Sequence, residues 1–173
     1  MALVLDGGGT ITGLTVGGLT DATIQQADLA PNVAGNGPAF CAYLSTNQSI
    51  ATNTWTKIAW NAKEFDTHNA FDSTTNYRFQ PQVAGYYQIQ GMWECNSAAT
   101  YSYADIRKNA ASFRVILASQ GSGTSNPFFG LVYLNGSTDY VDVWAFIVGG
   151  TSPNAIYGSQ IFTSIQGFLV RAA

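Results

Sequence analysis

A strictly alternating stretch near the middle of the chain, YYQIQGMW, limits the folds that this sequence can adopt. Tyr87, Ile89 and Trp93 fall on one side of an extended chain, whereas Gln88 and Gln90 fall on the other. A period of two with aromatic and β-branched residues is typical of a strand that buries one face. The chain is therefore expected to be built around a β-strand that lines a hydrophobic core.

Two residues ahead of this stretch indicate where the strand begins. Pro81 has no N–H to donate to a ladder, so the pairing of a central strand is expected only after it. Gly85 then predicts a bulge, or a close approach of another backbone, where the strand proper starts.

The chain from residue 38 onward predicts further short strands at the regular spacing of a β-sandwich. The expected strands are residues 40–44, 55–60, 101–107, 113–117, 128–134, 138–148 and 161–170. Asn135-Gly136 predicts a tight turn that joins the strands before and after it into a hairpin. A short helix is favoured only over residues 21–29, with Thr20 as its cap. The predicted fold class is all-β.

Three blocks of the sequence carry a family resemblance. They are Phe79-x-Pro81-x-Val83-x-Gly85-x-Tyr87-x-Ile89, Asp139-x-Val141-x-Val143-x-Ala145, and Ile165-Gln166-Gly167-Phe168-Leu169. In this order they resemble the complement-type globular heads, which share the trimeric jelly roll of the tumour-necrosis-factor ligands. The resemblance implies a homotrimer of jelly-roll sandwiches and places Asp139 in a turn. Ile89 departs from the family, which usually has an aromatic residue there.

Composition excludes two classes of partner. Charged residues make up 10% of the chain, against roughly 25% in an ordinary soluble domain. Seven basic residues and a net charge of −3 argue against nucleic acid, which needs clustered Lys and Arg. No apolar run approaches the roughly 20 residues of a membrane span.

Cys41 and Cys95 are expected to be free core thiols, although they could pair if their strands were neighbours.

The first 37 residues differ from the rest and are predicted to be a separate attachment segment, with residues 38–173 as the head domain. Short apolar groups stand between glycines, and residues 31–38, PNVAGNGP, read as a linker. The apolar residues expected to attach the protein are Leu3, Val4, Leu5, Ile11, Leu14, Val16 and Leu19. The opening MALVLDG resembles the N-termini of tailed-bacteriophage fibre and appendage proteins. That resemblance implies that this end binds other virion proteins.

One later strand is apolar on both faces. Val141 and Val143 suit a core, but Tyr140, Trp144 and Phe146 on the opposite face are nearly as apolar. A strand of this kind must be covered on both sides. The simplest cover is a second copy of the chain, so these three aromatic residues are predicted to lie in the trimer interface.

The sequence offers no catalytic constellation. His68 is the only histidine, and no nucleophile elbow or Cys/His cluster with ligand spacing occurs. Glycoside hydrolysis or calcium binding would require grouped carboxylates, but five aspartates are scattered and form no contiguous loop of ligands: Asp66, Asp72, Asp105, Asp139 and Asp142. We expect no enzyme, no cofactor and no metal site.

Aromatic residues beside glycine- and serine-rich turns are the candidates for receptor contact. These are Tyr101, Tyr103, Phe128 and Phe129, whose rings could stack on sugars or could fill the core instead.

The sequence therefore predicts a virion structural protein of a bacteriophage, made in the host cytoplasm. It would be a trimeric tail or head fibre, or a spike, that is anchored by its N-terminus and presents its head to a glycan or protein of the host surface. A capsid decoration or cement protein is the first alternative, and a glycan-degrading enzyme is a less favoured one.

Overall fold

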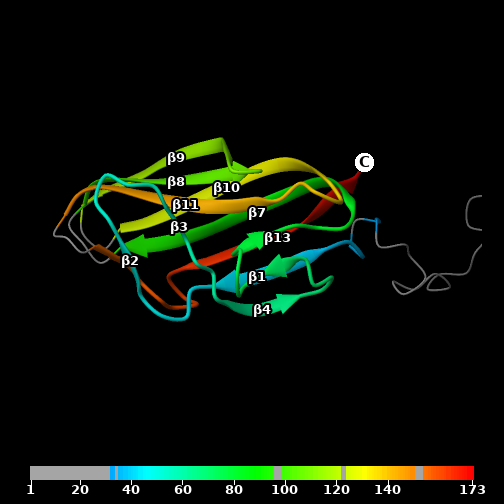
Figure 1. Cartoon of the computed structure of the whole chain (residues 1–173), viewed down its shortest axis with the longest axis horizontal. Coiled ribbons are helices and arrows are strands. Elements are labelled where there is room, and N and C mark those ends of the chain that lie inside the picture. Colours follow the sequence, from blue (N-terminus) through cyan, green and yellow to red (C-terminus); the bar gives the residue numbers. More distant parts are fainter. Residues whose placement is uncertain (1–31, 34, 96–98, 122–123, 151–153) are drawn as a thin grey trace, which may run out of the picture.

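The computed structural model describes residues 32–33, 35–95, 99–121, 124–150 and 154–173, and it is all-β (Figure 1). Two antiparallel sheets pack face to face around one hydrophobic core. No described residue lies in a helix, so this part of the chain has no helix long and apolar enough to cross a membrane. The fold class predicted from the alternating stretches is confirmed.

The first sheet has seven strands, with β7 at its centre. Its strands are β1 (Ala39–Tyr43), β2 (Gln48–Ile50), β4 (Ala62–Asp66), β7 (Ala84–Cys95), β10 (Thr124–Asn135), β12 (Asn154–Ile156) and β13 (Ser164–Ala172). β10 pairs with β7 on one side, and β13, β1 and β4 follow on the other. The short strands β12 and β2 continue the sheet beside the end of β7.

The second sheet has six strands in the order β5-β6-β11-β8-β9, and β3 also pairs with β11. Its strands are β3 (Thr56–Lys57), β5 (Phe71–Asp72), β6 (Arg78–Phe79), β8 (Ala99–Lys108), β9 (Ala111–Gly121) and β11 (Val141–Gly149). β9 packs beside β10, so these two strands form one edge of the sandwich. β4 and β5 lie at the opposite edge, where Asp66 accepts a hydrogen bond from the Phe71 N–H at 3.0 Å.

Aromatic side chains join the two sheets across the core. Phe40 of the first sheet stacks on Phe71 and Phe79 of the second, with ring centroids 4.7 and 4.5 Å apart. Trp60 packs against Phe128 at 6.2 Å, and both are buried. Each such ring contributes large apolar area to folding and holds the sheets in one relative position.

The central strand follows its sequence pattern closely. β7 begins at Ala84, after Pro81, and buries Tyr87, Ile89 and Trp93 completely. Gly85 marks a close approach, as predicted, because a Cβ there would lie 2.5 Å from the Arg171 carbonyl oxygen on β13. A residue with a side chain at this position would force the two strands apart.

The predicted hairpin around Asn135-Gly136 is wrong, although the turn itself is present. Gly136 has a φ of +70°, as a tight turn of this kind requires. The strands it joins then separate, because β10 pairs with β7 in the first sheet and β11 with β8 in the second. The local signal identifies the turn, but it cannot say that the turn crosses from one layer of a sandwich to the other.

Three other sequence predictions concern the two thiols, the strand over residues 55–60 and the N-terminal segment. Cys41 and Cys95 are buried free thiols, and β13 separates their strands, as expected for thiols that do not pair. The strand expected over residues 55–60 is reduced to the two residues of β3. The attachment residues and the helix at 21–29 lie outside the described residues.

Candidate assembly surface

The outer side of the β10–β7–β13 part of the first sheet is apolar and uncovered. Because successive side chains of a strand point to opposite faces, the residues between the core positions point outward. Six large outward side chains remain exposed: Tyr86 (44%), Phe129 (61%), Leu131 (49%), Tyr133 (40%), Phe168 (47%) and Val170 (43%). These six residues are called the apolar face below.

The register of the strands makes the apolar face continuous. Leu131 and Phe168 lie on either side of Gln88, and the rings of Tyr133 and Tyr86 are 5.5 Å apart. Residues 84–93, 125–135 and 164–170 include no Asp, Glu, Lys or Arg. The only polar side chains in the middle of this surface are therefore neutral amides and hydroxyls.

The apolar face is not flat and contains two hollows. A shallow hollow of about 510 Å³ opens among Gln90, Phe129 and Gln166. A second hollow, of about 530 Å³, lies among Tyr86, Leu131, Val170 and the C-terminal residues. Hollows of this size can receive projecting side chains of a partner.

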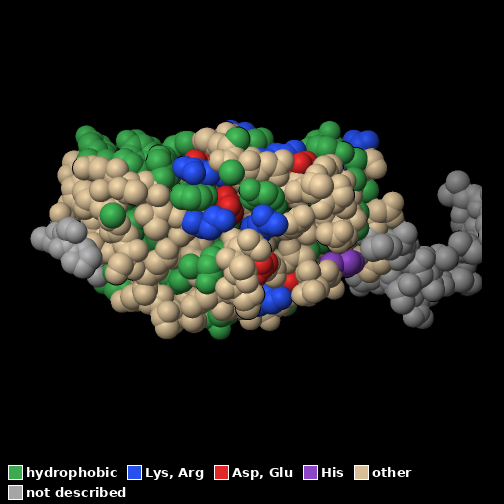
Figure 2. Space-filling view, in the orientation of Figure 1, with side chains coloured by type: hydrophobic (Ala, Val, Ile, Leu, Met, Phe, Trp, Pro, Cys, Tyr) green, Lys and Arg blue, Asp and Glu red, His purple; other side chains and the backbone are tan. Residues whose placement is uncertain are grey.

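The neighbouring edge strand β9 supplies such projecting side chains. Phe113, Val115 and Leu117 alternate along β9 and are 40%, 50% and 58% exposed. Figure 2 shows hydrophobic side chains gathered along the upper edge, where Figure 1 places β9. A contiguous apolar surface of this extent on a single chain indicates a protein–protein interface. The edge and the hollowed face are different surfaces, so they can join in a head-to-tail contact that closes into a ring.

The aromatic residues predicted for the trimer interface lie elsewhere, on the outer side of β11. Trp144 is half-buried, with the Arg107 guanidinium 4.1 Å and the Lys57 ammonium 5.9 Å from its ring. Phe146 packs on Trp55 at 5.1 Å, and the Arg78 guanidinium lies 4.2 Å from the ring of Tyr140.

One chain thus covers much of this side of β11 itself, with cations and a tryptophan rather than with a second copy. Charged side chains accordingly gather over β11 in Figure 2. A second copy is the simplest cover for such rings, but long cationic side chains also cover apolar surface. Contact of Tyr140, Trp144 and Phe146 with a second chain stays a prediction.

The four candidate receptor residues are not brought together. Phe128 is 1% exposed and packs against Trp60, so its prediction as a receptor contact is wrong. Phe129 is exposed but belongs to the apolar face. Tyr103 is half-buried against Phe146, and Tyr101 is 37% exposed on β8. For Tyr101 and Tyr103 a receptor role stays a prediction.

The sequence carries a signal for the apolar face. In FFGLVYL, residues 128–134, apolar side chains occupy both faces of the strand. Residues 140–146 show the same two-faced pattern. From the sequence alone, nothing distinguishes a strand covered by its own chain from one that needs a partner.

The carboxylates considered for catalysis have structural partners. The ion pairs are Asp66 with Lys63, Asp105 with Arg107, Asp139 with Lys108 and Asp142 with Lys57. His68 is exposed, with its Nδ1 2.9 Å from the Thr67 hydroxyl. Within the described ranges, no three His, Cys, Asp or Glu residues come together as metal ligands would.

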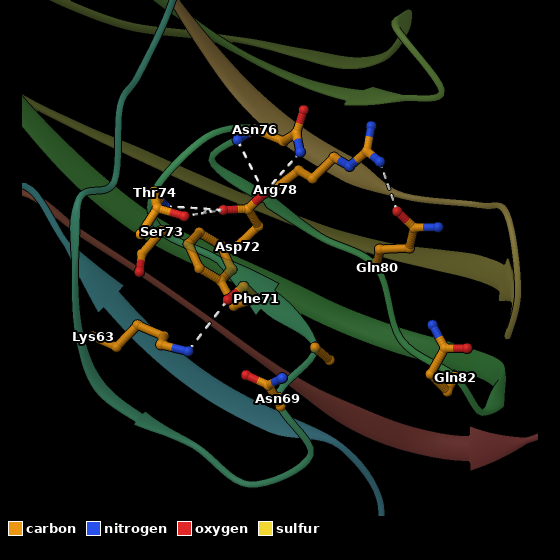
Figure 3. A pocket seen from close by; sticks show the side chains of 11 residues that line it. Lys63, Asn69, Phe71, Asp72, Ser73, Thr74, Asn76, Arg78, Gln80 and Gln82 are labelled. Carbon is orange, nitrogen blue, oxygen red and sulfur yellow. Dashed lines mark hydrogen bonds between the residues drawn. The ribbon is translucent and has the colours of Figure 1, made fainter.

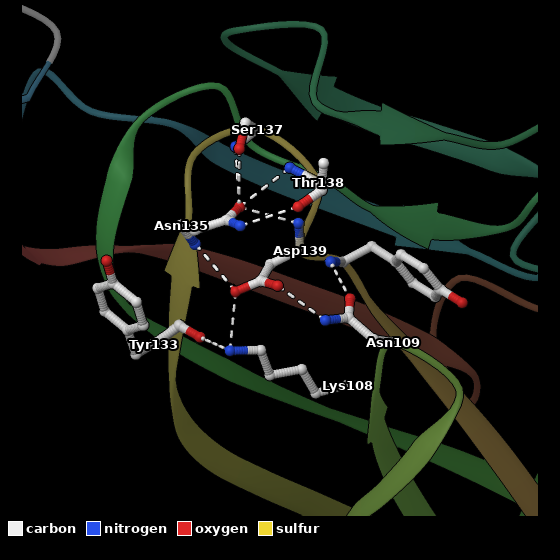
Figure 4. A network of polar contacts seen from close by, with 8 residues as sticks. Lys108, Asn109, Tyr133, Asn135, Ser137, Thr138 and Asp139 are labelled. Atoms are coloured by element: carbon white, nitrogen blue, oxygen red, sulfur yellow. Dashed lines mark hydrogen bonds and ion pairs between the residues drawn. The ribbon is translucent and has the colours of Figure 1, made fainter.

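Asp139 instead fixes the turn between β10 and β11, as the resemblance implied (Figure 4). Its carboxylate accepts hydrogen bonds from the Asn109 side chain at 2.7 Å and the Asn135 N–H at 3.1 Å, and it lies 2.8 Å from Lys108 Nζ. These donors hold the pKa of Asp139 below its usual range. By contrast, burial and the neighbouring Glu64 raise the pKa of the Cys41 thiol to about 11, so this thiol is unreactive at neutral pH.

Comparison with known proteins supports the architecture but gives no close relative. No family model matches the chain, and no curated protein sequence matches it. Solved structures do match. Murine APRIL superposes with a TM-score of 0.60 at 10% identity, over 77% of this chain and 98% of its own. The globular domain of the zebrafish complement 1qA protein gives a TM-score of 0.52 at 16% identity, over 79% of this chain and 99% of its own.

A third similar structure comes from a different setting. The vertex protein P5 of PRD1 superposes with a TM-score of 0.58 at 17% identity, over 78% of this chain and 97% of its own. Identities this low concern the fold alone. Taken with the topology above, the described chain has the jelly-roll sandwich fold of the tumour-necrosis-factor-like and complement-type heads.

Proposed function

We propose that this protein is a structural component of a bacteriophage virion, a homotrimeric fibre or spike that is held by its N-terminus and presents a jelly-roll head to the host surface. The observation that carries the proposal is the apolar face. A head domain that works alone has no use for six exposed hydrophobic side chains on one sheet, whereas a self-assembled head buries them.

Trimer formation is supported by the shapes of the surfaces that would meet. The edge strand β9 carries projecting apolar side chains, and the apolar face carries hollows. A contact between two different patches can repeat around a rotation axis and close into a ring. The fold shared with the tumour-necrosis-factor-like heads favours a ring of three. The outer side of β11, with Tyr140, Trp144 and Phe146, is a second proposed area of contact.

The two ends of the sandwich support a molecule with one attached end and one free end. The described chain starts beside the C-terminus, at the right in Figure 1, where the Leu169 N–H donates to the Pro38 carbonyl oxygen. At the opposite end, Cys95 pairs with Thr124, and Ala99 pairs with Gly121. An anchor at the first end would point the second end, which includes Tyr101, toward a partner. The likeness to a vertex protein favours a projection from a virion surface.

Removing residues 1–37 tests the attachment. If the segment containing Leu3, Val4, Leu5 and Ile11 only joins the head to the virion, the shortened protein folds and forms the same oligomer. It then fails to enter particles when it replaces the full-length protein during phage assembly. A shortened protein that no longer folds, or that still enters particles, contradicts this division of the chain.

Competition with the phage tests the adsorption role. The purified head should bind host cells and reduce infection by the parent phage. Binding should change little between low and physiological salt, because charged residues are only 10% of the chain. A head that ignores host cells, together with particles that lose heat resistance when it is absent, would identify a cement protein instead.

A further inference from the structure

A polar hollow lies at the edge of the sandwich opposite β9 and β10, away from the apolar face. It has a volume of about 550 Å³ and opens between the end of β4, the segment that includes β5 and β6, and the chain after β6 (Figure 3). Its walls carry mainly amides and hydroxyls. Six lining side chains matter for the argument: Lys63, Asn69, Asp72, Ser73, Arg78 and Gln82.

Two aspartates give the hollow a fixed shape. Asp66 accepts hydrogen bonds from the N–H groups of Ala70 at 2.9 Å and Phe71 at 3.0 Å, which fixes the turn after β4. Asp72 accepts from the N–H groups of Thr74, Thr75 and Asn76 at 2.9 to 3.1 Å. These donors hold the pKa of Asp72 well below its usual range. The walls are therefore set before any ligand arrives.

Several polar groups of this fixed wall are left for a ligand. Asn69, Ser73 and Gln82 make no side-chain hydrogen bond to any described residue, and Figure 3 draws all three at the hollow. The Arg78 guanidinium donates to Gln80 at 2.8 Å, yet no described carboxylate lies within ion-pair distance of it. The site thus offers amide groups, a hydroxyl and a fork of N–H donors together.

The chemistry of the lining narrows the class of ligand. Phe71 belongs to the core and is 3% exposed, so no exposed ring offers an apolar wall for a lipophilic molecule. Lys63 is paired with Asp66 at 3.0 Å, and the Asp72 carboxylate opposes Arg78 across the strand pair. Charges that nearly balance do not favour a phosphate or another anion. A ligand with many hydroxyls fits, because each hydroxyl both donates to and accepts from amides and carboxylates.

We propose that the polar hollow is a binding site for a neutral saccharide. The amides of Asn69 and Gln82 and the Ser73 hydroxyl lie around the hollow and contact different hydroxyls of the saccharide, and Arg78 donates to a ring or hydroxyl oxygen. The biological meaning of this site rests on the adsorption role proposed above, since it names a surface glycan as the partner. The site lies at the β4–β5 edge of the sandwich, so a contact between the β9 edge of one chain and the apolar face of the next would leave it open. Arg78 also lies 4.2 Å from the ring of Tyr140, so a contact at the outer side of β11 would lie beside the hollow.

Saturation-transfer difference NMR on the purified full chain tests the site. The probes are glucose, galactose, mannose, rhamnose, N-acetylglucosamine and N-acetylgalactosamine in the millimolar range, with glucuronic acid as an anionic probe. At least one neutral sugar should give a saturable transfer signal. Gln82→Ala and Asn69→Gly should each weaken its binding about fivefold, the loss expected for about one hydrogen bond. Glycine suits position 69 because the φ of Asn69 is +50°.

Gln166→Ala, at the hollow beside Gln90 and Phe129 on the outer side of the first sheet, is the matched control and should leave the signal unchanged. Three results would overturn the proposal. They are binding of glucuronic acid alone, no transfer signal from any sugar, and a sugar signal that is unchanged in both variants of the hollow. Thermal unfolding of each variant confirms that the fold is kept. Sugar binding without attachment to host cells would uphold the site and contradict the adsorption role, so the two can fail separately.

Discussion

Replacing Leu131 by Asp is the sharpest perturbation of the proposed interface. Leu131 lies in the middle of the apolar face and is 49% exposed in one chain. Full burial of a leucine side chain contributes about 1.5–3 kcal/mol, so burial of the exposed half contributes about 1 kcal/mol per chain to association. An aspartate loses this contribution and adds the cost of removing a carboxylate from water, which is several kcal/mol.

The combined loss is at least about 3 kcal/mol per chain, which weakens each contact more than about 100-fold. Light scattering coupled to gel filtration, over a range of micromolar concentrations, should therefore find Leu131→Asp as a monomer. Circular dichroism should find the same strand content as in the unchanged protein, since position 131 points away from the core.

Ile161→Asp is the matched control. Ile161 is 77% exposed in the turn before β13 and does not belong to the apolar face, so this variant should keep the mass of the unchanged protein. If Leu131→Asp keeps that mass as well, the apolar face is not the interface. If both variants become monomers, the location of the interface is wrong.

Three further predictions concern the stability of the head. Asp139→Asn should lower the free energy of unfolding by about 1–3 kcal/mol in urea titration. Lys108 loses its ion pair in this variant, and the Asn135 N–H loses its charged acceptor. Gly85→Ala should lower the melting temperature, since a Cβ would lie 2.5 Å from a backbone oxygen; Gly130→Ala meets only the tip of a side chain at 3.1 Å and should cost less. The pKa values of Asp72 and Asp139 are lowered by folding. Their contribution to the free energy of unfolding should therefore be complete above about pH 4 and lost as the pH falls through the folded-state pKa values. Urea titration at a series of falling pH values measures this loss. Equal stability at neutral pH and at about pH 3 would contradict this assignment.

Local sequence patterns predicted most of the fold because each pattern reports a local cause. Alternation around Tyr87 identified the buried face of the central strand, and Gly85 identified a close backbone contact. The hairpin at Asn135-Gly136 failed because pairing between strands depends on which layer each strand joins. A turn signal has no information about layers.

The candidate surfaces were harder to predict for a different reason. The ring of Trp144 is covered by Arg107, which lies far from it in the sequence, so its apolar character did not mean that a partner was needed. Leu131 has the same character but no such cover. The polar hollow depends on loops shaped by Asp66 and Asp72, whose side chains give no periodic signal.

Sedimentation equilibrium of the unchanged protein distinguishes a trimer from a monomer. We expect one species with three times the 18.4 kDa mass of the chain at micromolar concentrations. Because the contacts are apolar, this species should persist at high salt, which screens attraction between charges. A monomer under the same conditions would contradict the proposed trimer.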